Sequence, residues 1–216
     1  MNPRLALAIS IAKKSAVPKA SIEAAIARGQ GLSVTGAALE SVFVEAILPP
    51  SVATVLECQT DNKLRLLADL RLLIKEAGGS VSPIGYMFEK KGRIILQKKD
   101  GMDVDDVFEV VLETGALDVV EDAEGKVVVY TEPTQTNVTA VALAKDLQVE
   151  VEEAEIIWDP KADTKVPLDD EAMAKELNHF LDSLQDVAGV QGIYMNWSKG
   201  TISEGLWTEL QSKVAV

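Results

Sequence analysis

The sequence predicts an α+β protein in which a short basic helical segment precedes two units of mixed helices and strands. Apolar residues at helical spacing alternate along the chain with short β-rich runs, and turn-forming residues separate them. Hydrophobic residues make up 47% of the 216 residues and charged residues 25%, which is a globular composition. No apolar run approaches the roughly 20 residues of a transmembrane helix, so we expect no membrane partner.

The first 31 residues predict a pair of short helices. Asn2-Pro3 supplies an N-cap and a proline at the first helical position. Pro18 interrupts this helix and starts a second one, which ends at Gly29. Two such helices cannot bury both of their apolar stripes by themselves, so we expect them to pack on a further element or to belong to a larger bundle.

The next segment predicts a β-hairpin, a helix and a further strand. Runs rich in β-forming residues at 41–47 and 52–59 flank a turn that contains Pro49-Pro50. A helix is expected over 63–77, because N-capping residues precede leucines at helical spacing. Residues 92–98 then predict a strand.

A second α/β unit follows. It comprises a helix from Val104, strands at 117–121 and 127–130, a helix at 138–147 and a strand at 149–157. This alternation of elements is typical of small α+β sandwiches.

The last part of the chain predicts one more helix and strand. The acids at 169–171 favour the first turn of a helix, and a strand is expected at 190–197. Residues 200–216 predict a loosely attached tail with one amphipathic stretch at 206–210.

The two halves of the chain carry opposite charge. The net charge is −13, yet residues 1–100 hold 14 Lys and Arg against 9 Asp and Glu, and residues 101–216 hold 7 against 25. Phosphate binding depends on Lys and Arg, so a nucleic-acid partner would meet the first half. The simpler alternative is that the basic residues form an ordinary solvent-exposed face with no binding role.

The chain offers no evident catalytic chemistry. His179 and Cys58, its single histidine and single cysteine, lie far apart in sequence, so no base-activated nucleophile is indicated. Glycine-rich nucleotide loops are absent, and the aspartates at 100–106 lack the spacing of an EF-hand. We expect no enzyme, no cofactor, no metal site and no small-molecule substrate.

Several long stretches resemble the YebC/PmpR family. Residues 2–31 (NPRLALAISIAKKSAVPKASIEAAIARGQG) are similar to the family's Asn-Pro-Arg-Leu helix, Pro-Lys break and following helix. The stretches VLECQTDNKLRLLADLRLLIKEAGGSV at 55–81 and YMFEKKG at 86–92 resemble its central block. VEVEEAEIIWDPKADTKVPLDDE at 149–171 and VQGIYMNW at 190–197 resemble its C-terminal half.

The resemblance implies three domains: a basic helical one and two small α/β, ferredoxin-like domains, one inserted in the other. The expected divisions are 1–38 for an incomplete basic helical domain, 39–100 with 165–199 for the central domain, 101–164 for the acidic domain, and 200–216 for the tail. The family usually begins with a Lys-rich helix that this sequence lacks, so we expect an N-terminal truncation that has also removed a presequence.

The family includes bacterial DNA-binding transcriptional regulators, translation factors and a mitochondrial activator of cytochrome c oxidase subunit I translation. The segment AILPPS at 46–51 and the tail resemble fungal mitochondrial members. The resemblance therefore implies a monomeric, non-enzymatic translation factor that binds the mitochondrial ribosome, rRNA or tRNA in the matrix. The alternatives are a DNA-binding transcriptional regulator in a bacterial-type cytoplasm, or a protein-binding adaptor.

Phosphate contacts require cations and polar caps, and these gather in two places that match the family's basic positions. Few aromatic residues lie between them, which favours recognition of a folded RNA by shape and backbone over stacking on single strands. The predicted nucleic-acid contacts are Arg4, Lys13, Lys14, Lys19, Arg28, Asn62, Lys63, Arg65 and Arg71.

Overall fold

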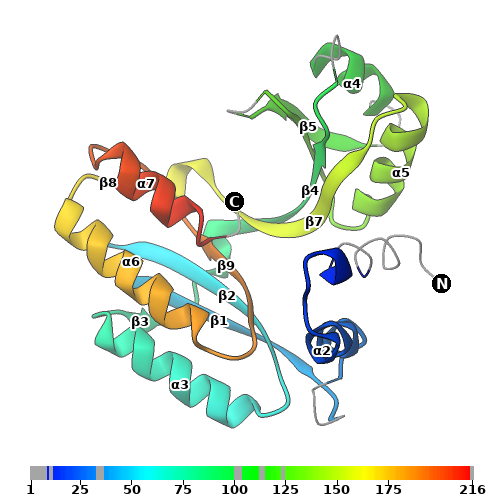
Figure 1. The fold of residues 1–216 in the computed structure, drawn as a ribbon. Coiled ribbons are helices and arrows are strands. Elements are labelled where there is room, and N and C mark those ends of the chain that lie inside the picture. Colours follow the sequence, from blue (N-terminus) through cyan, green and yellow to red (C-terminus); the bar gives the residue numbers. More distant parts are fainter. Residues whose placement is uncertain are drawn as a thin grey trace.

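The computed structural model consists of an N-terminal helical arm and two antiparallel sheets covered by helices (Figure 1). This is the α+β class that the sequence predicts. The structure describes residues 9, 12–32, 37–99, 104–111, 115–122 and 125–214. The predicted helix start at Asn2-Pro3 lies outside this part of the chain.

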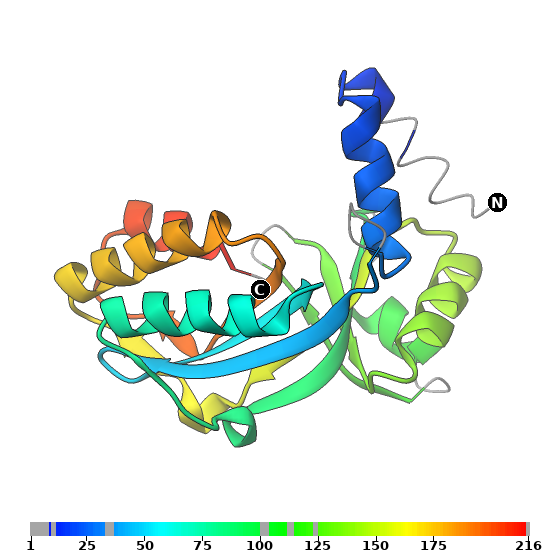
Figure 2. The same ribbon diagram turned by 90° about the horizontal axis from the view of Figure 1, so that it is seen from below.

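The arm contains a short helical stretch at 12–14 followed by helix α2 (Lys19–Gly29). Pro18 is the N-cap of α2, as its fixed φ and missing N–H predict. No residue of α2 is buried. Figure 2 shows α2 standing away from both sheets, in agreement with its lack of buried residues.

The first sheet has the strand order β3-β1-β2-β9. Strands β1 (Glu40–Leu48) and β2 (Val52–Thr60) form the predicted hairpin, with the cis Pro49-Pro50 bond in its turn. Strands β3 (Ser80–Val81) and β9 (Val190–Met195) flank this hairpin.

Helices α3 (Lys63–Glu76) and α6 (Glu171–Gln185) cover one face of the first sheet (Figure 1). Helix α3 turns Leu66, Leu70 and Ile74 toward the sheet, in the spacing predicted for an amphipathic helix. Complete burial of each large apolar side chain contributes about 1.5–3 kcal/mol. Side chains with almost no exposure in this core include Leu48, Leu56, Leu70, Ile74, Leu181 and Leu184.

The second sheet has the order β5-β6-β4-β7. The chain runs through it as β4-α4-β5-β6-α5-β7, which is the ferredoxin-like succession. The bounds of these elements are β4 (Phe88–Leu96), α4 (Val104–Val111), β5 (Ala116–Glu121), β6 (Val127–Thr131), α5 (Thr136–Asp146) and β7 (Val151–Pro160).

Strand β4 corrects the expected composition of the central domain. Its residues were expected to belong to that domain, but β4 pairs with β7 along its whole length and with β6 over residues 92–95. Ile94 and Leu96 of β4 belong to the core under α4 and α5, and this places the strand in the second sheet. The change of sheet therefore comes before Phe88 rather than at residue 100.

The two sheets share a small third core. The face of the first sheet opposite α3 and α6 contributes Ala53, Val55 and Tyr194, while Phe88 and Ile157 come from β4 and β7. All five of these side chains are buried. This contact joins the two units into one body.

The C-terminal segment is packed, which corrects the expectation of a loosely attached tail. Strands β8 (Val166–Leu168) and β10 (Trp197–Lys199) form a parallel pair, and helix α7 (Glu204–Gln211) follows. Leu210 is completely buried in the first core, because α7 packs on α6. The remaining short elements are the turns η1 (Gly85–Met87) and η2 (Ala162–Thr164). None of the described helices has both the length and the apolar character needed to span a membrane.

Candidate nucleic-acid interface

The arm carries four of the predicted contact residues on its surface. Lys13, Lys14, Lys19 and Arg28 are all exposed. Arg4, the fifth predicted contact of this segment, lies outside the described residues. The arm therefore presents a set of cations on an element that projects from the rest of the molecule (Figure 2).

These cations are weakly held. Lys19 Nζ lies 3.5 Å from a carboxylate oxygen of Glu23, one helical turn away, and the two side chains are 87% and 63% exposed. Such a surface pair contributes only about 0.3–0.5 kcal/mol. Arg28 sits in the last turn of α2, where a cation also stabilises the helix dipole. A phosphate group can displace contacts of this strength at small cost.

The second group of predicted residues begins helix α3. Asn62 is its N-cap: the side-chain oxygen accepts a hydrogen bond of 3.1 Å from the backbone N–H of Arg65. Its own N–H donates to Thr60 Oγ1 at 3.0 Å. Capping the helix is therefore a structural role that accounts for Asn62, whatever else it contacts. Lys63 and Arg71 are exposed on the same helix.

Strand pairing brings the two groups to the same end of the first sheet. Glu40, where the arm joins β1, is the register partner of Thr60, which lies two residues before Asn62, the N-cap of α3. Both the base of the arm and the start of α3 lie at this end in Figure 1. Arg71 lies six residues beyond Arg65, which is roughly 9 Å farther along the helix.

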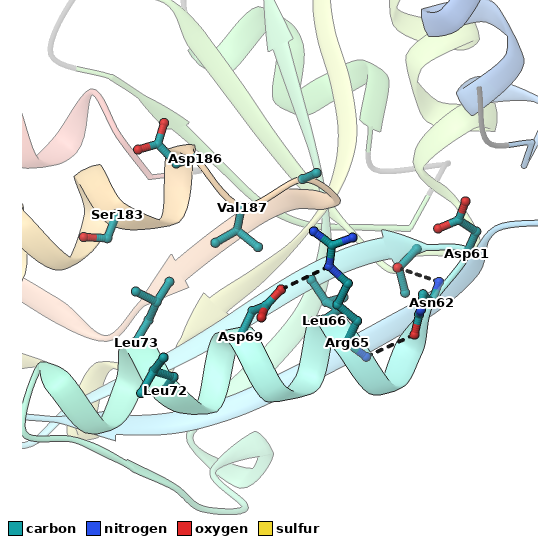
Figure 3. Close-up of a pocket in the computed structure, with 12 residues that line it drawn as sticks. Asp61, Asn62, Arg65, Leu66, Asp69, Leu72, Leu73, Ser183, Asp186 and Val187 are labelled. Carbon is teal, nitrogen blue, oxygen red and sulfur yellow. Dashed lines mark hydrogen bonds and ion pairs between the residues drawn. The ribbon is translucent and has the colours of Figure 1, made fainter. Parts of the chain in front are cut away.

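A surface pocket of about 550 Å³ lies between the start of α3 and the end of α6 (Figure 3). Arg65 extends into it, and its Nε lies 3.8 Å from a carboxylate oxygen of Asp69. Asp61 and Asp186 also line the pocket. Three carboxylates and one guanidinium in the lining disfavour a phosphate, so this pocket is a poorer anion site than the arm.

The nucleophile and base candidates have structural explanations. Cys58 is buried in β2, and this burial, with a smaller effect of Glu57, raises the pKa of its thiol to about 11. The thiolate that would react is therefore absent at neutral pH. His179 is exposed on α6. Across the described ranges, no group of three or more His, Cys, Asp or Glu side chains could hold a metal ion.

One basic residue was not singled out from the sequence and has a specific environment. Lys90 Nζ lies 4.7 Å from the ring centre of Phe43 and 4.4 Å from that of Trp158. Glu57 lies 3.9 Å away. These partners come from strands of both sheets, far apart in sequence, so no local pattern could have revealed them. Lys90 joins the two units and is not available as a free phosphate contact.

Two of the most similar relatives are bacterial proteins. A probable transcriptional regulatory protein of Bifidobacterium animalis subsp. lactis is 38% identical over 200 residues, which cover 91% of this chain and 77% of that protein. A protein of the same description from Persephonella marina is 39% identical over 199 residues, with 91% and 78% coverage.

A solved structure has a similar fold. The crystal structure of a conserved hypothetical protein from Aquifex aeolicus superposes with a TM-score of 0.68 at 32% sequence identity, covering 92% of this chain and 81% of that one. The family model described as the second and third domain of TACO1/YebC matches residues 39–197. With a match over most of its length and with relatives of this similarity, the chain belongs to the TACO1/YebC family.

Proposed function

We propose that this protein is a non-catalytic regulator of gene expression that binds nucleic acid through its N-terminal arm. The observation that carries the proposal is the exposure of Lys13, Lys14, Lys19 and Arg28 on a helical element that stands clear of the acidic remainder of the chain. Cations on a projecting arm can meet phosphates while the acidic units stay farther away.

A charge count supports this orientation. The described arm residues 12–32 contain the four cations and a single acid, Glu23. Residues 101–216 hold 25 acids against 7 bases, so a phosphate backbone is repelled there. Lys63 and Arg71 extend the basic surface from the base of the arm along α3. Arg65 contributes less, because Asp69 offsets its charge.

The descriptions of the relatives favour DNA as the partner. Two of the most similar are described as probable transcriptional regulatory proteins, which supports the DNA-binding alternative over the ribosome. Their bacterial sources likewise support a bacterial-type cytoplasm over the mitochondrial matrix. The translation factor remains a second candidate because the basic side chains of the arm are mainly lysines, which bind phosphates without reading base edges.

The test is fluorescence anisotropy with a labelled DNA duplex and a labelled RNA stem-loop of matched length, at low and raised salt. The proposal predicts binding that weakens steeply with salt, with a logarithmic slope of about 0.9 for each duplex phosphate contacted. A triple variant, Lys13→Ala with Lys14→Ala and Lys19→Ala, should bind roughly tenfold or more weakly and with a shallower slope.

The matched control removes three exposed lysines elsewhere: Lys99→Ala, Lys145→Ala and Lys175→Ala. It should leave duplex and stem-loop affinity almost unchanged. Tighter binding to the duplex supports the transcriptional regulator, whereas tighter binding to the stem-loop, with salt-sensitive sedimentation on ribosomes, supports the translation factor. Equal losses from the arm variant and the control would contradict the arm as the contact surface.

A further inference from the structure

A second cavity, of about 320 Å³, lies where the two units meet the C-terminal segment. Its lining comes from β6, β7 and β9 together with β10 and α7. The volume is at the low end of the range for small-ligand pockets, which suits one ring system with a short substituent.

The lining is rich in aromatic residues. All three tryptophans of the chain, Trp158, Trp197 and Trp207, contribute to it, together with Tyr130. Trp158 also packs against Phe43 and Lys90, and Trp197 is nearly buried, so these two also serve the core. Trp207 and Tyr130 are only half-buried. Their accessible surface is the part that a ligand can reach.

Trp207 is held in place at the cavity. Its ring meets that of Trp197 edge to face, with ring centres 6.2 Å apart and planes at 62°. Helix α7, which carries it, is fixed by the buried Leu210. A preorganised aromatic surface of this kind stacks a flat ring with little loss of conformational entropy.

The charges around the cavity leave one lysine without an ion pair. Asp159 is paired with Lys91, whose Nζ lies 2.7 Å from its carboxylate, and Lys199 is paired with Glu204. Lys165 lines the cavity, is exposed, and its side chain has no ion pair or hydrogen bond within the described ranges. The cavity therefore combines stacking surfaces with a single available cation.

We infer that this cavity binds one unpaired nucleotide, with its base against Trp207 and Tyr130 and its phosphate beside Lys165. Aromatic stacking with a nearby cation is the chemistry by which proteins hold single nucleotides of a strand. A proline-rich peptide also packs on aromatic rings, but it carries no anion for Lys165. The inference rests on the proposed function and deepens it by adding a second contact with nucleic acid, made by residues outside the arm.

The experiment uses the intrinsic fluorescence of the three tryptophans, excited at the red edge of their absorption where nucleobases do not absorb. The protein is titrated with adenosine monophosphate, adenosine and ribose phosphate, and then with short single-stranded RNA and DNA. The inference predicts saturable quenching by the monophosphate, which should bind more tightly than the nucleoside or the sugar phosphate. Tighter binding of a strand than of the monophosphate identifies the strand as the source of the nucleotide, and the reverse identifies the free nucleotide.

Two variants and two matched controls locate the site. Trp207→Leu should weaken binding roughly tenfold, as expected for the loss of one stacking ring, whereas Trp207→Phe should retain most of it. Lys165→Ala should abolish the preference for the monophosphate over adenosine. Tyr86→Leu and Lys145→Ala, which remove an exposed ring and an exposed lysine outside the cavity, should change nothing.

The experiments distinguish a wrong nucleotide site from a wrong proposed function. The triple lysine variant of the arm should lose duplex and stem-loop binding but keep quenching by the monophosphate. Absence of saturable quenching by any nucleotide, quenching by a proline-rich peptide instead, or unchanged affinity in a folded Trp207→Leu variant would overturn the site alone.

Discussion

The indole Nε1 of Trp158 donates a hydrogen bond of 2.8 Å to a carboxylate oxygen of Glu57, and this bond joins the second sheet to the first. Trp158 lies on β7 and Glu57 on β2. The ammonium group of Lys90 contacts the faces of both the Phe43 and the Trp158 ring and lies close to the same carboxylate. The apolar core that both sheets share also joins the two units, so the stability of each unit depends on the other.

Replacing Glu57 with alanine should lower the free energy of unfolding by about 1–2 kcal/mol, because the indole N–H loses a charged acceptor in a half-buried position. Urea unfolding followed by tryptophan fluorescence measures the change. Glu76→Ala, which removes an exposed carboxylate from α3, is the control and should be nearly neutral. Equal stability of the two variants would mean that the bond between the sheets contributes nothing.

Cys58 should make stability depend on alkaline pH. Burial raises the pKa of its thiol from about 9 to about 11, so the unfolded chain loses this proton at a lower pH than the folded one. The contribution of the protonated thiol to the free energy of unfolding is therefore complete below a pH of about 9, and it is lost as the pH rises toward about 11. Urea unfolding across this window should show a smaller decline for Cys58→Ala than for the wild type.

A chemical measurement checks the same burial. A thiol reagent at mildly alkaline pH should label Cys58 only as fast as the protein unfolds, and addition of denaturant should release the full reaction. Rapid labelling of the folded protein would show that Cys58 is reachable and would refute the assignment of a structural role.

Asn196 should be one of the most sensitive polar positions. It is completely buried, its side-chain oxygen accepts from the N–H of Ala53 at 2.7 Å, and its amide donates to the carbonyl of Thr164 at 2.6 Å. Asn196→Ala leaves both backbone groups without these partners and should cost about 2–4 kcal/mol. Asn137→Ala, at an exposed position of α5, should cost far less in the same thermal unfolding experiment.

Gly92 should tolerate no side chain unless its neighbours change. A Cβ at this position of β4 would collide with the hydroxyls of Thr136 and Thr131, and it would also approach Thr136 Cβ to 2.8 Å. Gly92→Ala should therefore cost about 1–3 kcal/mol. In a Thr136→Gly background, Gly92→Ala should lower the free energy of unfolding by less than it does in the wild type. Strictly additive effects in this double-mutant cycle would contradict the predicted clash.

Local elements could be predicted from the sequence because their signals are local. The prolines between two β-rich runs predicted the hairpin of β1 and β2. The capping residue Asn62, followed by leucines at helical spacing, predicted α3. The basic residues of the arm could be named for the same reason, since charge is read directly from the sequence. Their exposure follows from the arm's few contacts with the sheets.

Pairing between distant segments could not be predicted in this way. The pattern of 92–98 predicts a strand, which the structure forms as β4 at Phe88–Leu96, but it does not say whether that strand pairs with β2 or with β7. The amphipathic stretch of the C-terminal segment likewise did not reveal that Leu210 enters the first core. The cavity beside Trp207 has lining residues that are separated by dozens of positions, so only the fold assembles it.

The most direct test of the central claim is site-specific photo-cross-linking in the cell of origin. A photoreactive side chain is placed at Lys13 in one variant and at Lys145, an exposed position on α5, in another. If the arm is the nucleic-acid contact, DNA or RNA should be recovered from position 13 and almost none from position 145. Recovery of as much nucleic acid from position 145 as from position 13 would contradict the claim.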